Sequence, residues 1–156
     1  MIEADRIKIQ AISLQDIARF SEYRDKEEVA MYQSWDEYPL NKAINRIEYC
    51  QKHPFHGQIG NYQFGLYLKE NNQLIGDIFI EIDGHTTFTL GYTLDSVYWS
   101  KGYASEALKS VFKAMHETYS FKICLCHVYE DNIKSIKLLE RNGFDKIHKS
   151  WFYQDV

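Results

Sequence analysis

Small residues stand where a strand-like run is followed by a helix-like run, in the stretch YWSKGYASEA (98–107). Gly102 would let a ligand approach the main chain without meeting a Cβ, and Ala104 is nearly as small. The first N–H groups of a helix lack partners within the helix and carry the positive end of its dipole. The stretch therefore predicts a cradle for an anion such as a phosphate or pyrophosphate.

The strength of such a cradle limits what it can bind alone. Each hydrogen bond to a charged group contributes about 1.5–3 kcal/mol, whereas micromolar binding requires about 8 kcal/mol. We therefore expect the ligand to have a further, partly apolar arm that lies along the protein. The alternative is that Gly102 only eases the turn and that Ala104 only packs the helix on the sheet.

A second pair of polar residues, Asn132 and Ser135, opens the next helix-like run. Because each predicted helix start follows a strand, we expect both to flank one crevice at the carboxyl ends of the strands, where open α/β sheets bind ligands. Asn132 could instead serve only as an N-cap, and Ser135 only as a solvent-facing residue of the first turn.

The N-terminal elements that support this crevice follow from the hydrophobic pattern. Residues 6–12 alternate as a strand, and residues 13–29 are typical of a helix with Ser13 as its N-cap. A second helix is expected over 41–52, where Pro54 stops it. An antiparallel meander follows over 61–94, with a turn at Asn71–Asn72 and a two-residue hairpin turn at Asp83–Gly84.

The C-terminal elements have a different period. Apolar residues from Ala104 to Met115 recur at spacings of three and four, which predicts an amphipathic helix. A strand over 121–129 and a helix that ends at Asn142–Gly143 follow, and one or two strands complete the chain. With no linker or repeat, the order predicts one α/β domain over residues 1–156.

Composition narrows the class of protein. The 156 residues are 45% hydrophobic and carry a net charge of −4, which disfavours a nucleic-acid binder because phosphates require a clustered basic surface. No apolar run reaches the roughly 18–20 residues that span a bilayer. The N-terminus is charged from its third residue, so we expect no signal peptide and a cytoplasmic location. A monomer and a homodimer both remain open.

Cysteines and histidines do not indicate a further site. Three cysteines form no disulfide framework, and we expect Cys124 and Cys126 to be small buried residues on one face of a strand. His53 and His56 lack the accompanying ligands of a metal site, so a loop is the better interpretation and no metal is expected.

Two motifs at a defined separation resemble a known family. The runs LGYTL (90–94), YWSKGYASEAL (98–108) and VYEDNIKSIKLLERNGF (128–144) are similar to the GNAT N-acetyltransferase superfamily, in particular to its RimJ/RimL-like branch of ribosomal-protein N-terminal acetyltransferases. The resemblance implies a mixed, mostly antiparallel central sheet flanked by helices in three layers. It also implies acetyl-CoA as the donor and direct transfer of the acetyl group to an amine.

The resemblance further implies roles for particular residues. The pantetheine arm would lie along Tyr92, Thr93 and Leu94, and the pyrophosphate loop would comprise Trp99, Ser100, Lys101, Gly102, Tyr103 and Ala104, with Ser105 beginning the helix. Asn132 would contact the pantetheine or help to hold the site. Ser135 would lie near the thiol, where a hydroxyl could stabilise or protonate the departing thiolate.

Three departures from the family pattern matter. Leu139 stands where many members have a tyrosine general acid, so that role would fall to Ser135, to water or to no group. Thr89 stands where this branch often has an acidic residue. The chain also ends soon after SWFYQDV (150–156), so we expect the family's last strand to be short or absent.

The general base and the acceptor site are less clearly marked. Alternation along 76–83 places Asp77, Phe79, Glu81 and Asp83 on one face, and Glu81 is the preferred base if that face borders the acceptor, with a solvated strand face as the alternative. Tyr92 and His85 are weaker candidates. In the segment 31–41, Tyr32, Trp35 and Glu37 could frame a cationic acceptor, or the segment could pack against the sheet.

The sequence therefore predicts an acetyl-CoA-dependent N-acetyltransferase that acts on a primary amine, for example the N-terminal α-amine of a protein. One alternative is a small amine such as a polyamine, an amino acid or an aminoglycoside. Another is a CoA-binding or sensing module without catalysis, which Leu139 and Thr89 keep open. A generic nucleotide-binding domain is disfavoured because the chain lacks both a phosphate-loop lysine motif and a dinucleotide fingerprint.

Overall fold

Eight strands of the computed structural model, which describes residues 2–147 and 150–154, form one sheet in the order β1-β2-β3-β4-β5-β6-β8-β7. The strands are β1 (Ile2–Glu3), β2 (Ile7–Gln10), β3 (Gly60–Leu68), β4 (Leu74–Ile82), β5 (Thr87–Leu94), β6 (Ile123–His127), β7 (Asp145–Ile147) and β8 (Ser150–Gln154). Neighbouring strands are antiparallel except β5 and β6, which are parallel. The predicted mixed, mostly antiparallel sheet is confirmed.

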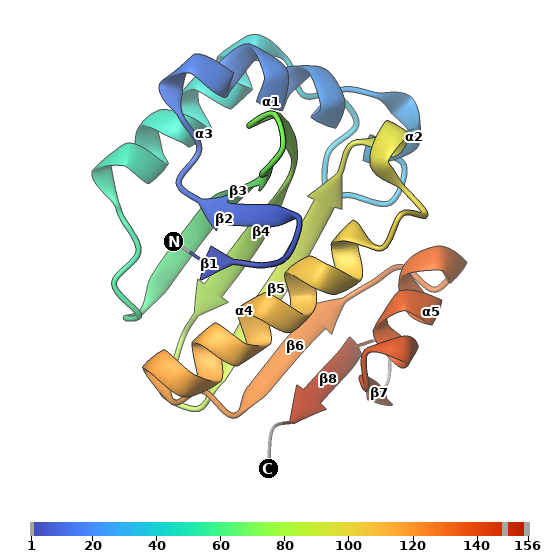
Figure 1. The fold of residues 1–156 in the computed structure, drawn as a ribbon. Coiled ribbons are helices and arrows are strands. Elements are labelled where there is room, and N and C mark those ends of the chain that lie inside the picture. The colour runs from blue at the N-terminus through green and yellow to red at the C-terminus, as the bar shows by residue number, and fades with distance from the viewer. Residues whose placement is uncertain (1, 148–149, 155–156) are drawn as a thin grey trace.

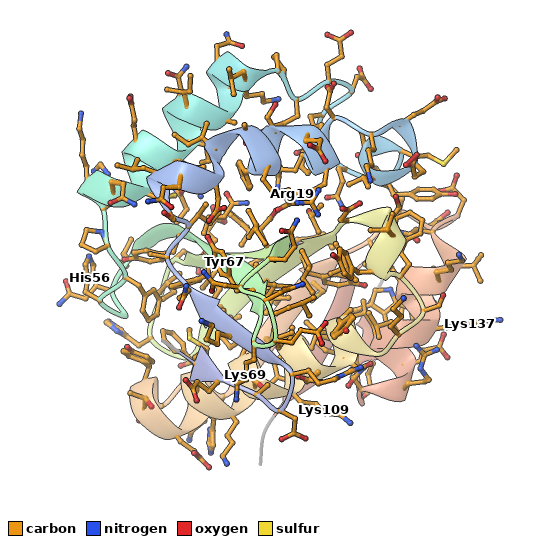
Figure 2. The ribbon with its side chains drawn as sticks, turned by 45° about the horizontal axis from the view of Figure 1, so that its top comes forward. Arg19, His56, Tyr67, Lys69, Lys109 and Lys137 are labelled. Carbon is orange, nitrogen blue, oxygen red and sulfur yellow. The ribbon has the colours of Figure 1, made fainter. Side chains whose placement is uncertain are left out.

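Helices cover both faces of this sheet. They are α1 (Ile17–Arg24), α2 (Glu27–Ala30), α3 (Leu40–Lys52), α4 (Tyr103–Tyr119) and α5 (Ile133–Arg141), with short 3₁₀ turns at Leu14–Asp16 and Ser96–Tyr98. The sheet lies between α1 and α3 on one side and α4 and α5 on the other (Figures 1 and 2). No helix within the described ranges is both long enough and apolar enough to cross a membrane.

Two apolar cores hold these layers together. Alternation along β4 buries Ile78, Ile80 and Ile82 in the core that also contains Leu108 and Val111 of α4. The opposite side of the sheet contributes to a second core, in which α1 and α3 pack on the strands through Phe20, Tyr23, Ala43, Ile47, Tyr67 and Leu74. Burial on both sides explains why the sheet requires helices on both.

Several local predictions are confirmed. Ser13 caps the first 3₁₀ turn by accepting a hydrogen bond from the main-chain N–H of Gln15. Gly143, with φ of 85°, follows the end of α5 in the left-handed conformation that favours glycine. Cys124 and Cys126 are each 2% exposed, and the loop between α3 and β3 contains His53 and His56.

Other local predictions are wrong. The single helix expected over 13–29 is divided into a 3₁₀ turn, α1 and α2, because Lys26 adopts an extended conformation between the two helices. The expected two-residue hairpin is a longer loop, since Ile82 pairs with Phe88 and Gly84 lies outside the left-handed region. Of the two expectations for the last strand, short or absent, the structure shows a short strand, because β8 has five residues and pairs along the whole of β6.

The contact between β5 and β6 is short. Their parallel pairing runs from Thr87↔Ile123 to Thr89↔Leu125, and β5 then continues to Leu94. Among the described residues, no pairing between these strands is present beyond Thr89. The sheet therefore opens beside the C-terminal part of β5.

Candidate active site

A cleft of about 570 Å³ lies where β5 ends and where α4 and α5 begin. All residues predicted to bind the cofactor line this cleft except Lys101: Tyr92, Thr93, Leu94, Trp99, Ser100, Gly102, Tyr103, Ala104, Ser105, Asn132 and Ser135. The structure thus brings the two helix starts to one crevice, at the end of β5 where the sheet opens.

The start of α4 has the geometry of an anion cradle. Gly102 is its N-cap and has φ of 83°, a left-handed conformation that costs a residue with a Cβ about 1–2 kcal/mol. Ser100, two residues earlier, also has a positive φ, of 62°. No side-chain cap is present at the N-cap of α4 within the described part of the chain, so the first main-chain N–H groups of this helix, which belong to residues lining the cleft, lack a capping acceptor.

The start of α5 is different, because its N-cap is occupied from within the chain. The side-chain oxygen of Asn132 accepts a hydrogen bond from the main-chain N–H of Ser135, at 3.4 Å. Asn132 therefore caps α5, and it also lines the cleft. Of the two helix starts, that of α4 is the better anion site.

Arg6 holds the loop before α4 in place, and sequence reasoning missed it. Its guanidinium donates to the carbonyl oxygen of Lys101 at 3.0 Å and to the carboxylate of Glu106 at 2.8 Å, and it lies 4.2 Å from the centre of the Tyr103 ring. Arg6 comes directly before β2, which lies far from this loop in sequence. No local pattern marks it, because the contact depends on the fold.

Trp99 connects the two sides of the cleft. Its indole N–H donates to the carbonyl oxygen of Leu94 at 2.8 Å, and the ammonium of Lys134 lies 5.4 Å from its ring centre. Lys134, Lys137 and Arg141 of α5 also line the cleft, and Lys137 extends outward from α5 (Figure 2). These cations give this wall a positive charge that suits a phosphorylated ligand.

Two hydroxyl groups meet in the cleft. The phenol of Tyr92 on β5 donates a hydrogen bond to Ser135 Oγ on α5, at 2.9 Å. Burial raises the pKa of Tyr92 well above its ordinary value, so the phenol keeps its proton. Leu139, one turn after Ser135, is fully buried in the core, so it presents no polar group to the cleft.

The predicted acceptor residues are only partly brought together. Tyr32 lines the cleft, whereas Trp35 and Glu37 do not. The indole of Trp35 donates to the carbonyl oxygen of Arg24, and its ring lies 3.8 Å from the Arg24 guanidinium. The aromatic segment does frame a cation, but this cation is the chain's own arginine. Glu28 and Asp131, which sequence reasoning did not select, line the cleft instead.

The structure does not place Glu81 in the cleft. Ile78 pairs with Tyr92, and Glu81 lies three residues further along β4, so its side chain points to the opposite face of the sheet from Tyr92. Glu81 is exposed and pairs with Thr89, the residue that departs from the family pattern. A direct catalytic role for Glu81 therefore requires the acceptor to approach from the face of α1 and α3.

Buried ion pairs attach α1 and α2 to the strands below them. Asp77 of β4 accepts hydrogen bonds from Arg24 at 2.6 Å, from Gln63 at 2.8 Å and from the phenol of Tyr23. Asp77 is only 1% exposed, so the interpretation of its strand face as solvated is wrong at this position. The pair fixes α1 over the middle of the sheet.

A second carboxylate, Asp95, lies directly after β5 and is also 1% exposed. It accepts hydrogen bonds from Arg19 at 2.5 Å and from Lys26 at 2.7 Å, and Arg19 lies between α1 and the sheet (Figure 2). Burial raises the pKa of Asp95, but the hydrogen bonds from Lys26 and Arg19 outweigh burial and hold it below its ordinary value. Asp95 therefore connects the end of β5, which lines the cleft, to α1 and to the start of α2.

Comparison with known proteins gives a family match over most of the chain. A family model described as an acetyltransferase (GNAT) domain matches residues 6–145. A probable N-acetyltransferase, YjcK of Bacillus subtilis, is 33% identical over 132 residues, which cover 81% of this chain and 71% of YjcK. The N-acetyltransferase p20 of Bacillus licheniformis is 26% identical over 145 residues, covering 91% of this chain and 80% of p20.

Solved structures share the fold at low sequence identity. A GNAT-family acetyltransferase from Bacillus anthracis has a TM-score of 0.84 and 20% identity, covering 99% of this chain and 97% of that one. The ribosomal L7/L12 α-N-protein acetyltransferase RimL, solved with coenzyme A, has a TM-score of 0.82 and 12% identity, with coverages of 98% and 97%. A spermidine N-acetyltransferase from Vibrio cholerae, solved with CoA and spermine, has a TM-score of 0.81 and 14% identity, with coverages of 96% and 95%.

Proposed function

Since the chain belongs to the GNAT acetyltransferase family and is an acetyl-CoA-dependent N-acetyltransferase, we propose that its cleft binds acetyl-CoA between α4 and α5 and that the acceptor is a primary amine. The observation that carries this proposal is that the uncapped start of α4 and Ser135 line the same cleft. Bound there, acetyl-CoA supplies an acetyl group activated as a thioester.

The residues of the cleft fit the parts of this donor. The first-turn N–H groups of α4 would bind the pyrophosphate, with Gly102 leaving room at the main chain and Arg6 holding the loop. The segment 90–94 of β5, beyond its pairing with β6, would offer main-chain groups to the amides of the pantetheine arm, much as a neighbouring strand does. Together these contacts provide an anion cradle for the pyrophosphate and a strand edge for the extended arm of the ligand. Micromolar binding requires both.

The reaction itself needs few protein groups. The amine nitrogen forms a bond to the acetyl carbonyl carbon, the carbon–sulfur bond breaks, and the sulfur leaves with the electron pair. Ser135 would donate a hydrogen bond to this sulfur as its negative charge develops. The amine loses one proton to solvent or to a base. The departing sulfur gains one proton, so the number of protons is unchanged overall.

Glu81, the preferred base, does not line the cleft, and this bears on which amine reacts. An α-amine with a pKa of about 7.7–8.0 is partly neutral at pH 7, whereas a lysine amine near 10.4 is almost fully charged. We therefore propose the N-terminal α-amine of a protein as the acceptor, with a small amine as the alternative. Proteins of the same fold are named for each kind of acceptor: RimL for a protein α-amine and the Vibrio cholerae enzyme for spermidine.

The general base stays a prediction. Glu81 would act directly, or through water, only on an amine that enters from the face of α1 and α3. Replacing Glu81→Gln tests this role, since loss of a general base lowers kcat about 10²–10⁴-fold. An unchanged kcat in Glu81→Gln would remove Glu81 from the mechanism and would leave the rest of the site untouched.

Thiol release from acetyl-CoA in the presence of separate acceptors tests the function. The panel contains peptides with a free N-terminus, the same peptides with a blocked N-terminus and one lysine, spermidine, single amino acids and an aminoglycoside. We expect free-N-terminus peptides to release thiol fastest at pH 7. Equal rates on the blocked, lysine-bearing peptides would overturn the α-amine preference, and calorimetric binding of acetyl-CoA with no thiol release on any acceptor would favour a CoA sensor.

A further inference from the structure

We propose that Tyr92 is a positioning residue that makes Ser135 a hydrogen-bond donor toward the departing sulfur, an inference that rests on the proposed function. The two side chains come from different elements, β5 and α5, and both line the cleft. Their hydroxyl oxygens are 2.9 Å apart, with the phenol as donor. The contact joins the strand that would hold the pantetheine arm to the helix that would face its sulfur.

The direction of this hydrogen bond matters because a serine hydroxyl has one hydrogen and two lone pairs. A serine in the first turn of a helix can direct its hydrogen to a nearby main-chain carbonyl, where the hydrogen is lost to a ligand. When the phenol of Tyr92 occupies a lone pair of Ser135 Oγ, the single hydrogen of Ser135 can point into the cleft. Tyr92 would then donate to Ser135, and Ser135 would donate to the sulfur as the final acceptor.

Such a chain strengthens the last donor without moving a proton. Hydrogen bonds in series polarise one another, so the Ser135 hydroxyl becomes a better donor when Tyr92 donates to it. Burial keeps the phenol protonated, so Tyr92 remains a donor throughout. As the carbon–sulfur bond breaks, the sulfur takes the electron pair and the Ser135 hydrogen bond stabilises its charge.

The surroundings leave Ser135 few other partners on this wall. The next residue on the same helix face, Leu139, is fully buried and apolar. The main-chain N–H of Ser135 is already bonded to the side chain of Asn132, so only the hydroxyl of Ser135 is available to a ligand. Tyr92 is therefore the side chain that decides whether this hydroxyl donates or accepts.

A double-mutant cycle on kcat and KM tests this role. Tyr92→Phe keeps the ring and removes the hydroxyl, and we expect kcat to fall about three- to tenfold, the effect of one neutral hydrogen bond. We expect the KM for acetyl-CoA to change by less than about twofold, because the bond acts when charge develops. Ser135→Ala should lower kcat more, by about ten- to a hundredfold, the effect of one hydrogen bond to a charged group. Adding Tyr92→Phe to Ser135→Ala should lower kcat no further.

The matched control is Tyr62→Phe. Tyr62 is likewise a tyrosine on a strand, and its phenol donates to the carbonyl oxygen of Gln58 at 2.8 Å, outside the cleft. The kcat of the Tyr62→Phe variant should stay at the wild-type value. An unchanged kcat in Tyr92→Phe, or an equal further loss in the double variant, would overturn the positioning role. Melting temperature and calorimetric acetyl-CoA affinity separate both outcomes from misfolding, and absence of thiol release by the wild type would instead overturn the proposed function.

Discussion

The guanidinium of Arg6 donates a hydrogen bond to the carbonyl oxygen of Lys101 at 3.0 Å, across 95 residues of sequence. The same guanidinium pairs with Glu106 and lies over the ring of Tyr103. A residue directly before β2 thereby fixes the loop that precedes α4. The shape of the proposed pyrophosphate cradle depends on this distant contact as well as on the local sequence.

Replacing Arg6→Ala should weaken acetyl-CoA binding. We expect the Kd to rise about three- to tenfold, the effect of losing one hydrogen bond that orders the loop. Isothermal titration calorimetry measures the change. Lys8→Ala removes a nearby cation on β2 that bonds to Asn72; this variant is the control and should bind normally. An unchanged Kd in Arg6→Ala would show that the loop keeps its shape without the arginine.

Substitution of Gly102 should separate backbone strain from charge. In Gly102→Ala, a Cβ at φ of 83° would lie 3.3 Å from Arg6 Nη2, the movable end of a side chain, and strain of about 1–2 kcal/mol should weaken binding about tenfold. Gly102→Glu adds bulk and a negative charge, and should abolish binding. Gly84→Glu is the matched control, because a Cβ there meets no atom within 4 Å. Retained affinity in Gly102→Glu would contradict the placement of the pyrophosphate.

Removal of the Asp77 carboxylate should destabilise the protein strongly. In Asp77→Ala the Arg24 guanidinium would stay buried without its counter-ion, so we expect the free energy of unfolding to fall by about 3–5 kcal/mol. Urea denaturation measures this loss. Glu81→Ala is the control on the same strand, and because Glu81 is exposed its effect should stay within about 0.5 kcal/mol. Equal losses in the two variants would contradict the buried ion pair.

Stability should depend on Asp95 in acid. Because its pKa is lowered in the folded state, Asp95 stabilises the protein fully above the ordinary value of about 3.9, and this contribution is lost as the pH falls through the lower folded value. Asp95→Asn should therefore be less stable than the wild type at neutral pH, and the difference should shrink below about pH 4. Urea denaturation across pH gives the two curves. Asp83→Asn, at an exposed position, should follow the wild type, and a constant difference for Asp95→Asn would contradict the prediction.

The sequence predicted those features that local pattern controls. The period of three and four from Ala104 to Met115 marked α4, and Asn142–Gly143 marked the end of α5. The hairpin at Asp83–Gly84 failed because the register of β4 and β5, which Ile82 and Phe88 set, leaves a longer loop. Local preference for a tight turn was outweighed by cross-strand pairing.

The sequence could not reveal contacts between distant charges. Arg24 and Asp77 lie 53 residues apart in sequence, and only the packing of α1 on β4 buries them together. Trp35 was expected at the acceptor because an aromatic next to acidic residues is typical of cation binding. The fold gives it a cation from the chain itself, and this could be found only from the positions of α1 and the segment that follows it.

In the middle of the sheet, β5 continues past Thr89 with β4 paired along one edge, while its other edge has no pairing with β6 among the described residues. On the outside of a protein, such a stretch recruits strands from other molecules and promotes aggregation. Here Leu90, Thr93 and Leu94 are buried, and α4 and α5 lie over this side of the sheet (Figure 1). The free edge of β5 can therefore receive a narrow ligand, but a strand from a second copy of the protein cannot pair with it. The opening in the sheet thus does not promote self-association.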